Sequence, residues 1–257
     1  MLEKLKEFLL APRANCMGCG SLKGAEEDWL CLKCAAALAP LVLRSAEEQQ
    51  ICSACGEVYT GGICRGCGKR SVTTLTAVAA YEYEDPVRGM VHAFKFRGVW
   101  RMGRLMAEKM NEALGERDFT RIVPVPLHFT RRFERGYNQS EVLAKELSRL
   151  TGKPWENTLK RVRRTRQQAK LKEEARRKNL DGAFKAVNRP EGEKILLIDD
   201  IRTTGSTVSR CAQELLRAGA ESVTVLTFAR AILQTKNYRK YNPDRGIKRQ
   251  KPQTDPF

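Results

Sequence analysis

The chain has 257 residues, enough for one core domain together with a small additional module. Lysine and arginine number 47 against 30 aspartate and glutamate residues, so the formal net charge is +17. This excess of positive charge favours a polyanionic partner, nucleic acid before an anionic membrane surface, and it does not specify a fold. The sequence has no apolar run of about 18 residues, so no membrane-spanning helix is expected.

The N-terminal ten residues alternate charged and apolar side chains and predict a short amphipathic helix. They lack the apolar core of a signal peptide, so we expect a cytoplasmic chain. Because thiols stay reduced in the cytoplasm, the nine cysteines are better interpreted as metal ligands than as disulfides.

Eight of the nine cysteines form four C-x-x-C pairs within residues 1–70: Cys16 and Cys19, Cys31 and Cys34, Cys52 and Cys55, Cys64 and Cys67. The two-residue gap lets both thiolates of a pair reach one metal ion, and four thiolates make a closed structural zinc site. The simplest pairing is sequential and predicts two Cys₄ sites, a double zinc ribbon. The alternative is an interleaved pairing, in which the two middle pairs share one metal ion.

Other interpretations of the cysteines fit the sequence less well. A redox C-x-x-C motif is not expected four times over, and four cysteine ligands leave no open position for a catalytic zinc ion. A module of about 70 residues has a thin core, so we expect the metal ions to supply much of its folding energy. The ninth cysteine, Cys211, is expected to be a small buried residue rather than a nucleophile.

Strands and helices alternate from residue 72 to about 230. Strands are expected at 73–83, 121–126, 159–163, 195–198 and 223–228, and helices at 86–97, 101–114, 140–150 and 207–218. Residues 35–50 predict a helix-rich connector and 127–139 a loop. The alternation predicts an α/β fold with a parallel, doubly wound sheet, whose ligands bind at the carboxyl ends of the strands. The remaining basic tail, 231–257, is expected to be disordered.

The most informative stretch follows the strand expected at 195–198. Asp199 and Asp200 stand at the strand's carboxyl end, and a turn follows that consists of Thr203, Thr204, Gly205, Ser206 and Thr207. Backbone N–H groups converge in such a turn and the next helix adds a positive dipole, so the turn is suited to phosphate. The aspartates repel phosphate and are placed to accept hydrogen bonds from hydroxyls or to hold a cation. A ligand such as ribose 5-phosphate satisfies both halves.

An ordinary strand–turn–helix connection with a Ser/Thr cap is the alternative, but a cap does not need two aspartates before Thr-Thr-Gly. A Walker loop is excluded because its Gly-Lys-Ser/Thr end is missing. The stretch resembles the phosphoribosyl-pyrophosphate signature of type I phosphoribosyltransferases. That resemblance implies that Asp199 and Asp200 hold the ribose 2- and 3-hydroxyls. It further implies that residues 203–207 wrap the 5-phosphate and that Mg²⁺ bridges the pyrophosphate and the ribose.

Two basic clusters carry further donors. Arg135, Asn138 and Gln139 lie just before the helix expected at 140–150, and residues 161–178 contain nine lysine and arginine residues against two glutamates. Such a run is usually a solvated helix face. Here amides and threonines interleave with the arginines, which favours phosphate or nucleotide binding.

In its order of motifs, the chain resembles the ComF family over about residues 14–230. The motifs are the zinc ribbons, 95–98 (Lys-Phe-Arg-Gly), 123–126 (Val-Pro-Val-Pro), 135–139 (Arg-Gly-Tyr-Asn-Gln), the basic segment 164–184, the aspartate-threonine stretch and 228–230 (Phe-Ala-Arg). The resemblance implies a phosphoribosyltransferase-like protein associated with natural transformation, the uptake of single-stranded DNA. It makes Lys95 a candidate pyrophosphate contact and places Arg135, Asn138 and Gln139 near the mouth of the active site.

Related sequences are often labelled amidophosphoribosyltransferase, an activity that needs a glutaminase domain with a nucleophilic N-terminal cysteine. This chain begins Met-Leu-Glu and continues into zinc sites, so we do not expect a glutamine amidotransferase. As an enzyme it would be a phosphoribosyltransferase with Asp199, Asp200, Lys95 and Arg135 as catalytic candidates, although no hood for a nucleobase acceptor is recognisable.

These observations are compatible with two functions. The first is a protein that binds phosphoribosyl pyrophosphate with Mg²⁺ and handles single-stranded DNA in transformation. The second is a phosphoribosyltransferase of nucleotide metabolism with an unknown acceptor and no DNA role. The basic surface is also compatible with a protein partner such as a competence helicase.

Overall fold

The computed structural model describes residues 15–23, 29–43, 49–59, 61–64, 67–68, 74–163 and 182–231. The expected N-terminal helix, the basic segment 164–181 and the tail beyond residue 231 lie outside this part of the chain. Within the described residues, no helix is both long enough and apolar enough to cross a bilayer.

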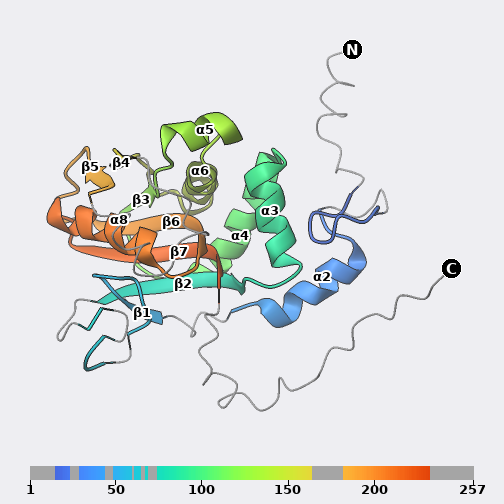
Figure 1. The fold of residues 1–257 in the computed structure, drawn as a ribbon, viewed down its shortest axis with the longest axis horizontal. Helices are drawn as coiled ribbons and strands as arrows, with labels where there is room; N and C mark the ends of the chain where they lie inside the picture. Colours follow the sequence, from blue (N-terminus) through green and yellow to red (C-terminus); the bar gives the residue numbers. More distant parts are fainter. Residues whose placement is uncertain are drawn as a thin grey trace.

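Five of the described strands build a central sheet in the order β1-β2-β7-β6-β3 (Figure 1). Strands β2 (Thr74–Glu82), β7 (Ser222–Arg230), β6 (Lys194–Arg202) and β3 (Arg121–Pro124) run parallel, and β1 (Gln49–Cys52) is an antiparallel edge strand. The prediction of an α/β fold with a parallel sheet flanked by helices is thereby confirmed. Strand β1 was not predicted, because it comes from within the cysteine module.

Helices cover both faces of the sheet, and the apolar run of β6 explains why. Leu196 and Ile198 face a core formed with α3 (Val87–Phe96), α4 (Gly103–Leu114) and α6 (Gln139–Thr151). Ile195 and Leu197 face the opposite core, against α8 (Ser206–Arg217) and the antiparallel pair of β4 (Leu159–Arg161) and β5 (Phe184–Ala186). A strand that is buried on both sides needs apolar residues at every position rather than at alternate ones.

Three methionines of the segment formed by η2 (Trp100–Met102) and α4 are buried. Met102, Met106 and Met110 have no exposed surface and pack in the core that α3, α4 and α6 share. Two short 3₁₀ helices, η1 (Ala39–Leu41) and η2 (Trp100–Met102), complete the connections, and η2 leads directly into α4.

Three local expectations differ from the structure. The loop expected at 127–139 contains helix α5 (Phe129–Arg135), which the His128 ring caps by accepting from the Thr130 amide and which ends at Gly136 with φ of 77°. The helix of the connector is α2 (Leu32–Leu38), which begins earlier than expected. Strand β6 continues past Ile198 to Arg202, because β7 goes on pairing beside it, so the two aspartates belong to the strand itself.

Candidate functional site

A cavity of about 440 Å³ opens where the parallel strands end. Its walls come from the ends of β3, β6 and α3, from α5 and the start of α6, and from the first turn of α8. All the non-cysteine site residues expected from the sequence line it: Lys95, Arg135, Asn138, Gln139, Asp199, Asp200, Thr203, Thr204, Gly205, Ser206 and Thr207. The structure thus brings together residues from three separate regions of the chain.

The two aspartates are held differently. Asp200 is buried, and its Oδ1 lies 2.9 Å from the Nζ of Lys95, which stands near the end of α3. Asp199 Oδ1 accepts hydrogen bonds from Ser140 Oγ and from the Asp200 backbone amide, each at 3.0 Å. Burial, and then the charge of Asp200, raise the pKa of Asp199 to about 7, against the opposing effects of Lys95 and Ser140.

Residues 203–207, which we call the phosphate loop, lead from β6 into α8. Gly205 is the N-cap residue of α8 and has a left-handed backbone with φ of 73°, and the hydroxyls of Thr204 and Ser206 lie 3.0 Å apart. No side chain caps the amino end of α8, and its first turn carries no acidic residue. The first backbone N–H groups of the helix and its dipole are therefore directed toward an anion in the cavity.

The opposite wall is built by α5 and α6. The side chain of Asn138 forms hydrogen bonds to two backbone groups. Its Oδ1 accepts from the Ser140 amide at 3.2 Å, and its Nδ2 donates to the Val125 carbonyl at 3.2 Å. Gln139 is buried; its Oε1 accepts from Arg135 at 3.1 Å, and its Nε2 has no hydrogen-bond partner among the described residues. The Nε2 of Gln139 is therefore a donor that a ligand in the cavity can use, whereas Asn138 fixes the position of Ser140.

Several lining residues were not singled out from the sequence. Ser140 contacts an aspartate 59 positions away, and Arg161 was counted only as part of a basic run, yet both line the cavity. Arg161 is mostly buried over the Phe184 ring, and this burial lowers the pKa of its guanidinium. Phe96 completes the mouth and is stacked by the Arg135 guanidinium at 4.9 Å from the ring centroid. Only the Lys-Phe-Arg-Gly motif pointed toward Phe96.

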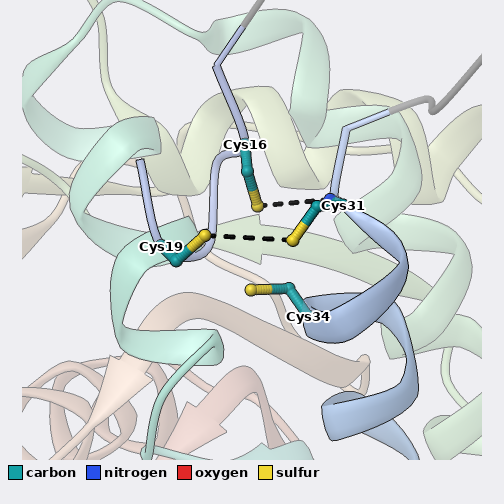
Figure 2. Close-up of side chains that lie close together, drawn as sticks. All are labelled: Cys16, Cys19, Cys31 and Cys34. Atoms are coloured by element: carbon teal, nitrogen blue, oxygen red, sulfur yellow. Dashed lines mark hydrogen bonds between the residues drawn. The ribbon is translucent and has the colours of Figure 1, made fainter. Parts of the chain in front are cut away.

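The cysteines form two separate clusters, as the sequential pairing predicted. Cys16, Cys19, Cys31 and Cys34 make the first cluster (Figure 2) and Cys52, Cys55, Cys64 and Cys67 the second, with the sulfur atoms of each cluster within 4.8 Å of one another. Recorded Sγ–Sγ distances are 3.6–3.9 Å. Sulfur atoms at about 2.3 Å around one zinc ion are about 3.8 Å apart, so both clusters fit tetrahedral zinc.

Backbone amides support the first cluster, since Cys16 Sγ accepts from the amides of Gly18 and Cys31 at 3.3 Å each. The cluster packs on the helix that carries Lys95. A Cβ built on Gly89 of α3 would lie only 1.8 Å from the Gly18 carbonyl oxygen, so the two backbones touch directly.

Residues 98–255 match the family of phosphoribosyl transferase domains. Competence protein F of Haemophilus influenzae is 33% identical over 193 residues, which cover 70% of this chain and 84% of that protein. DNA utilization protein YhgH of Salmonella typhimurium is 33% identical over 196 residues, 72% of this chain and 86% of that protein. Among solved structures, adenine phosphoribosyltransferase from Thermoanaerobacter pseudethanolicus aligns over 57% of this chain and 83% of its own, with 17% identity and a TM-score of 0.30.

The fold and the matched family define the chain as a protein with a phosphoribosyl transferase domain. Within that class, the chain belongs to the family of competence protein F and YhgH, the ComF/YhgH family. The resemblance inferred from the order of motifs is confirmed. Four-cysteine clusters suited to zinc precede the domain.

Proposed function

We propose that the cavity binds phosphoribosyl pyrophosphate, or a phosphoribose end, together with Mg²⁺, and that the protein handles single-stranded DNA in natural transformation. The observation that carries this proposal is the position of Asp199 and Asp200 beside the phosphate loop on one cavity wall. Acceptors for vicinal hydroxyls and donors for a phosphate therefore lie next to each other in one cavity, as they do in a ribose 5-phosphate site.

Each part of the ligand has a matching group. The amides and hydroxyls of the phosphate loop hold the 5-phosphate, and the carboxylates accept from the ribose 2- and 3-hydroxyls. Lys95 and Arg135, which line the same cavity, neutralise the pyrophosphate. Mg²⁺ prefers oxygen ligands and keeps part of its water shell, and it supplies charge neutralisation of the pyrophosphate when bound.

If the protein turns over, the bond between the anomeric carbon of ribose and pyrophosphate breaks and an acceptor bonds to that carbon. Charge develops on the sugar as a cation and on the departing pyrophosphate as an anion. Asp199 and Asp200 stabilise the first through the ribose, and Lys95 and Arg135 stabilise the second. A pyrophosphate-release assay with the zinc-loaded protein, phosphoribosyl pyrophosphate and single-stranded DNA tests whether DNA is the acceptor.

A double variant, Asp199→Asn with Asp200→Asn, tests the ligand. Titration calorimetry with phosphoribosyl pyrophosphate and Mg²⁺ should show binding to the parent protein and none to the variant, because each amide replaces one acceptor oxygen by a donor and removes the negative charge that attracts Mg²⁺. Asp118→Asn is the control: this carboxylate is exposed and pairs with Lys194 at 2.8 Å, away from the cavity. Affinity retained by the double variant would remove the ligand assignment.

The DNA part of the proposal is supported by charge and by exposed aromatic residues on α3 and α5, two helices that contribute to the cavity wall. Phe96, paired with Arg135, is 59% exposed, and Phe133 on α5 is 92% exposed. Exposed rings among cations are how proteins hold single strands, by stacking bases and neutralising phosphates. The names of the two relatives, which refer to competence and to DNA utilization, agree with this assignment.

Binding of a labelled oligonucleotide, followed by fluorescence anisotropy, tests the DNA part. Affinity should fall with salt at a logarithmic slope of roughly −0.7 for each phosphate contact. Phe133→Ala should weaken binding by about fivefold or more, since a stacked base contributes about 1–3 kcal/mol. Leu150→Ala, an exposed apolar residue near the end of α6, should leave it unchanged. Absent or salt-insensitive binding would favour the alternative, a phosphoribosyltransferase of nucleotide metabolism.

A further inference from the structure

The second cysteine cluster lies directly against the phosphate loop. A Cβ built on Gly56, the residue after Cys55, would lie 2.2 Å from the carbonyl carbon of Gly205, and one built on Gly205 would lie 2.3 Å from the carbonyl oxygen of Gly56. Carbon atoms pack favourably at about 3.5–4.0 Å, so neither position has room for a side chain. Both residues also have positive φ, +81° and +73°, which glycine adopts without strain.

Hydrogen bonds join the same two segments on the other side of the contact. Ser209, in the first turn of α8, is fully buried; its Oγ donates to the carbonyl of Ser53 and lies 3.4 Å from the carbonyl oxygen of Cys52. We call residues 52–56 the second knuckle. The Gly56 amide closes it by donating to the Cys52 carbonyl at 2.7 Å. The second knuckle thus contacts the backbone of Gly205 directly and is hydrogen-bonded to the side chain of Ser209.

A further hydrogen bond reaches the strand that enters the phosphate loop. Arg202, the last residue of β6, donates to the side-chain oxygen of Gln49 at the start of β1. The phosphate loop is therefore held by the cysteine module before it, within it and after it. Neither Gly56 nor Ser209 lines the cavity, so any effect they have on a ligand passes through the loop.

We propose that the second knuckle, with its cluster loaded with metal, positions the phosphate loop, and that Gly56 and Ser209 are the positioning residues. The proposal rests on the proposed function for the identity of the ligand. A cradle of backbone amides binds phosphate well only when the amides converge before the ligand arrives, because ordering them on binding costs affinity. The rigid knuckle supplies that order.

The other knuckle glycines provide matched controls. Gly20 follows Cys19 with φ of +81°, and Gly68 follows Cys67 with φ of +68°, and a Cβ at either position meets nothing within 4 Å. Alanine at Gly20, Gly68 or Gly56 introduces similar backbone strain at the same place in a knuckle. Only Gly56→Ala also drives a methyl group into the phosphate loop.

The test compares these three variants as full-length, zinc-loaded proteins by calorimetry with phosphoribosyl pyrophosphate and Mg²⁺. Gly56→Ala should weaken binding by about tenfold or more, because a displacement of about 1 Å in positioned groups can cost up to 100-fold. Gly20→Ala and Gly68→Ala should stay within about threefold of the parent, and all three should keep their zinc. Amide hydrogen exchange should rise in residues 203–209 of Gly56→Ala alone.

Ser209→Ala is a second, milder variant that decides the question if Gly56→Ala does not fold. It removes the hydrogen bonds to the knuckle and adds no clash, so exchange in the phosphate loop should rise and affinity should fall severalfold. Its control is Cys211→Ala, on the same helix but packed in the core against the sheet strands β6 and β7.

A merely structural contact would lower the melting temperature of Gly56→Ala and Ser209→Ala without changing the affinity or loop exchange of the folded proteins, and this result would overturn the proposal. Equal effects in Gly56→Ala and Gly68→Ala would overturn it as well. If the parent protein does not bind phosphoribosyl pyrophosphate, the proposed function fails. The exchange comparison then still decides whether the knuckle orders the loop.

Discussion

Asp199 occupies surroundings that oppose its own ionisation. It is half-buried in the cavity wall, stands next to a second carboxylate, and has its pKa raised to about 7. Lys95 forms an ion pair with Asp200 rather than with Asp199, so one of the two neighbours has a cationic partner and the other keeps its proton up to about neutral pH. A ribose hydroxyl or a cation entering the cavity therefore meets an acceptor whose charge is adjustable near neutral pH.

This raised pKa predicts how stability depends on pH. The unfolded chain ionises Asp199 near its ordinary pKa of 3.8, whereas the folded protein holds the proton until about pH 7. The folded state therefore binds more protons in that window, and this group lowers stability as pH rises from about 4 to 7. Asp199→Asn removes the effect, so relative to the parent it should gain at least about 1 kcal/mol between pH 5 and pH 8.

Denaturant unfolding at the two pH values measures this difference. Asp118→Asn is the contrasting case, because Lys194 lowers the pKa of Asp118 and leaves it ionised across the whole window. Its difference from the parent should be the same at pH 5 and pH 8. A stability difference for Asp199→Asn that does not change with pH would contradict the raised pKa.

The role of site residues that are consecutive in the sequence can be predicted from the sequence alone. Contacts between residues that only folding brings together cannot. Asp199, Asp200 and the phosphate loop are consecutive, so their chemistry was readable from the residue types. The hydrogen bond from Ser140 to Asp199 spans 59 positions and has no local signal. Asn138 was expected at the mouth and does line the cavity, but its hydrogen bonds to backbone groups depend on tertiary contacts.

At the scale of elements, the start of α6 links the fold to the site. Asn138 caps the helix and anchors it to the Val125 carbonyl after β3, and the next residues present Gln139 and Ser140 to the cavity. Asn138→Ala should lower the free energy of unfolding by about 1–2 kcal/mol, the usual cost of a lost cap. Because Ser140 loses its orientation, affinity for phosphoribosyl pyrophosphate should also fall.

Asn138→Ser is the comparison, since a hydroxyl can still accept from the Ser140 amide although it is too short to reach the Val125 carbonyl. Chemical denaturation and calorimetry should place this variant between the parent and Asn138→Ala. Equal stability of the parent and Asn138→Ala would show that the cap contributes nothing.

The sequence predicts the long helices and strands but not the short ones. Strands β2 and β7 and helices α3, α4 and α6 fall close to their expected positions, because each has enough residues to show an apolar period. Helix α5 has only seven residues and depends on the His128 cap and on Gly136, so no period marks it. Strand β6 exceeds its apolar run because pairing with β7 continues through Asp199 to Arg202, a tertiary effect that overrides the residue types.

At the scale of the whole molecule, the two cysteine clusters contact different halves of the site. The first packs through Gly18 on α3, which carries Lys95, and the second through Gly56 on the phosphate loop. We expect two zinc ions per chain, one in each cluster. Metal removal by a chelator should lower the melting temperature sharply, because the binding energy of structural zinc is folding energy.

Elemental analysis of single variants checks this expectation. Cys19→Ser and Cys67→Ser should each reduce the content to about one zinc ion per chain, whereas Cys211→Ser should keep two, since Cys211 lies in the sheet core outside both clusters. Loss of zinc from both clusters on a single substitution would show that the clusters do not bind independently.

The pairing of β1 with β2 makes the cysteine module part of the central sheet. β1 runs from Gln49 to Cys52, the first cysteine of the second cluster, and it covers the outer edge of β2 with antiparallel hydrogen bonds (Figure 1). A shortened protein starting near residue 72 would leave the N–H and C=O groups of that edge unpaired, a template for another chain to add its own strand. Such a fragment should self-associate, whereas the full chain, whose β2 edge is covered by β1, should not associate through that edge.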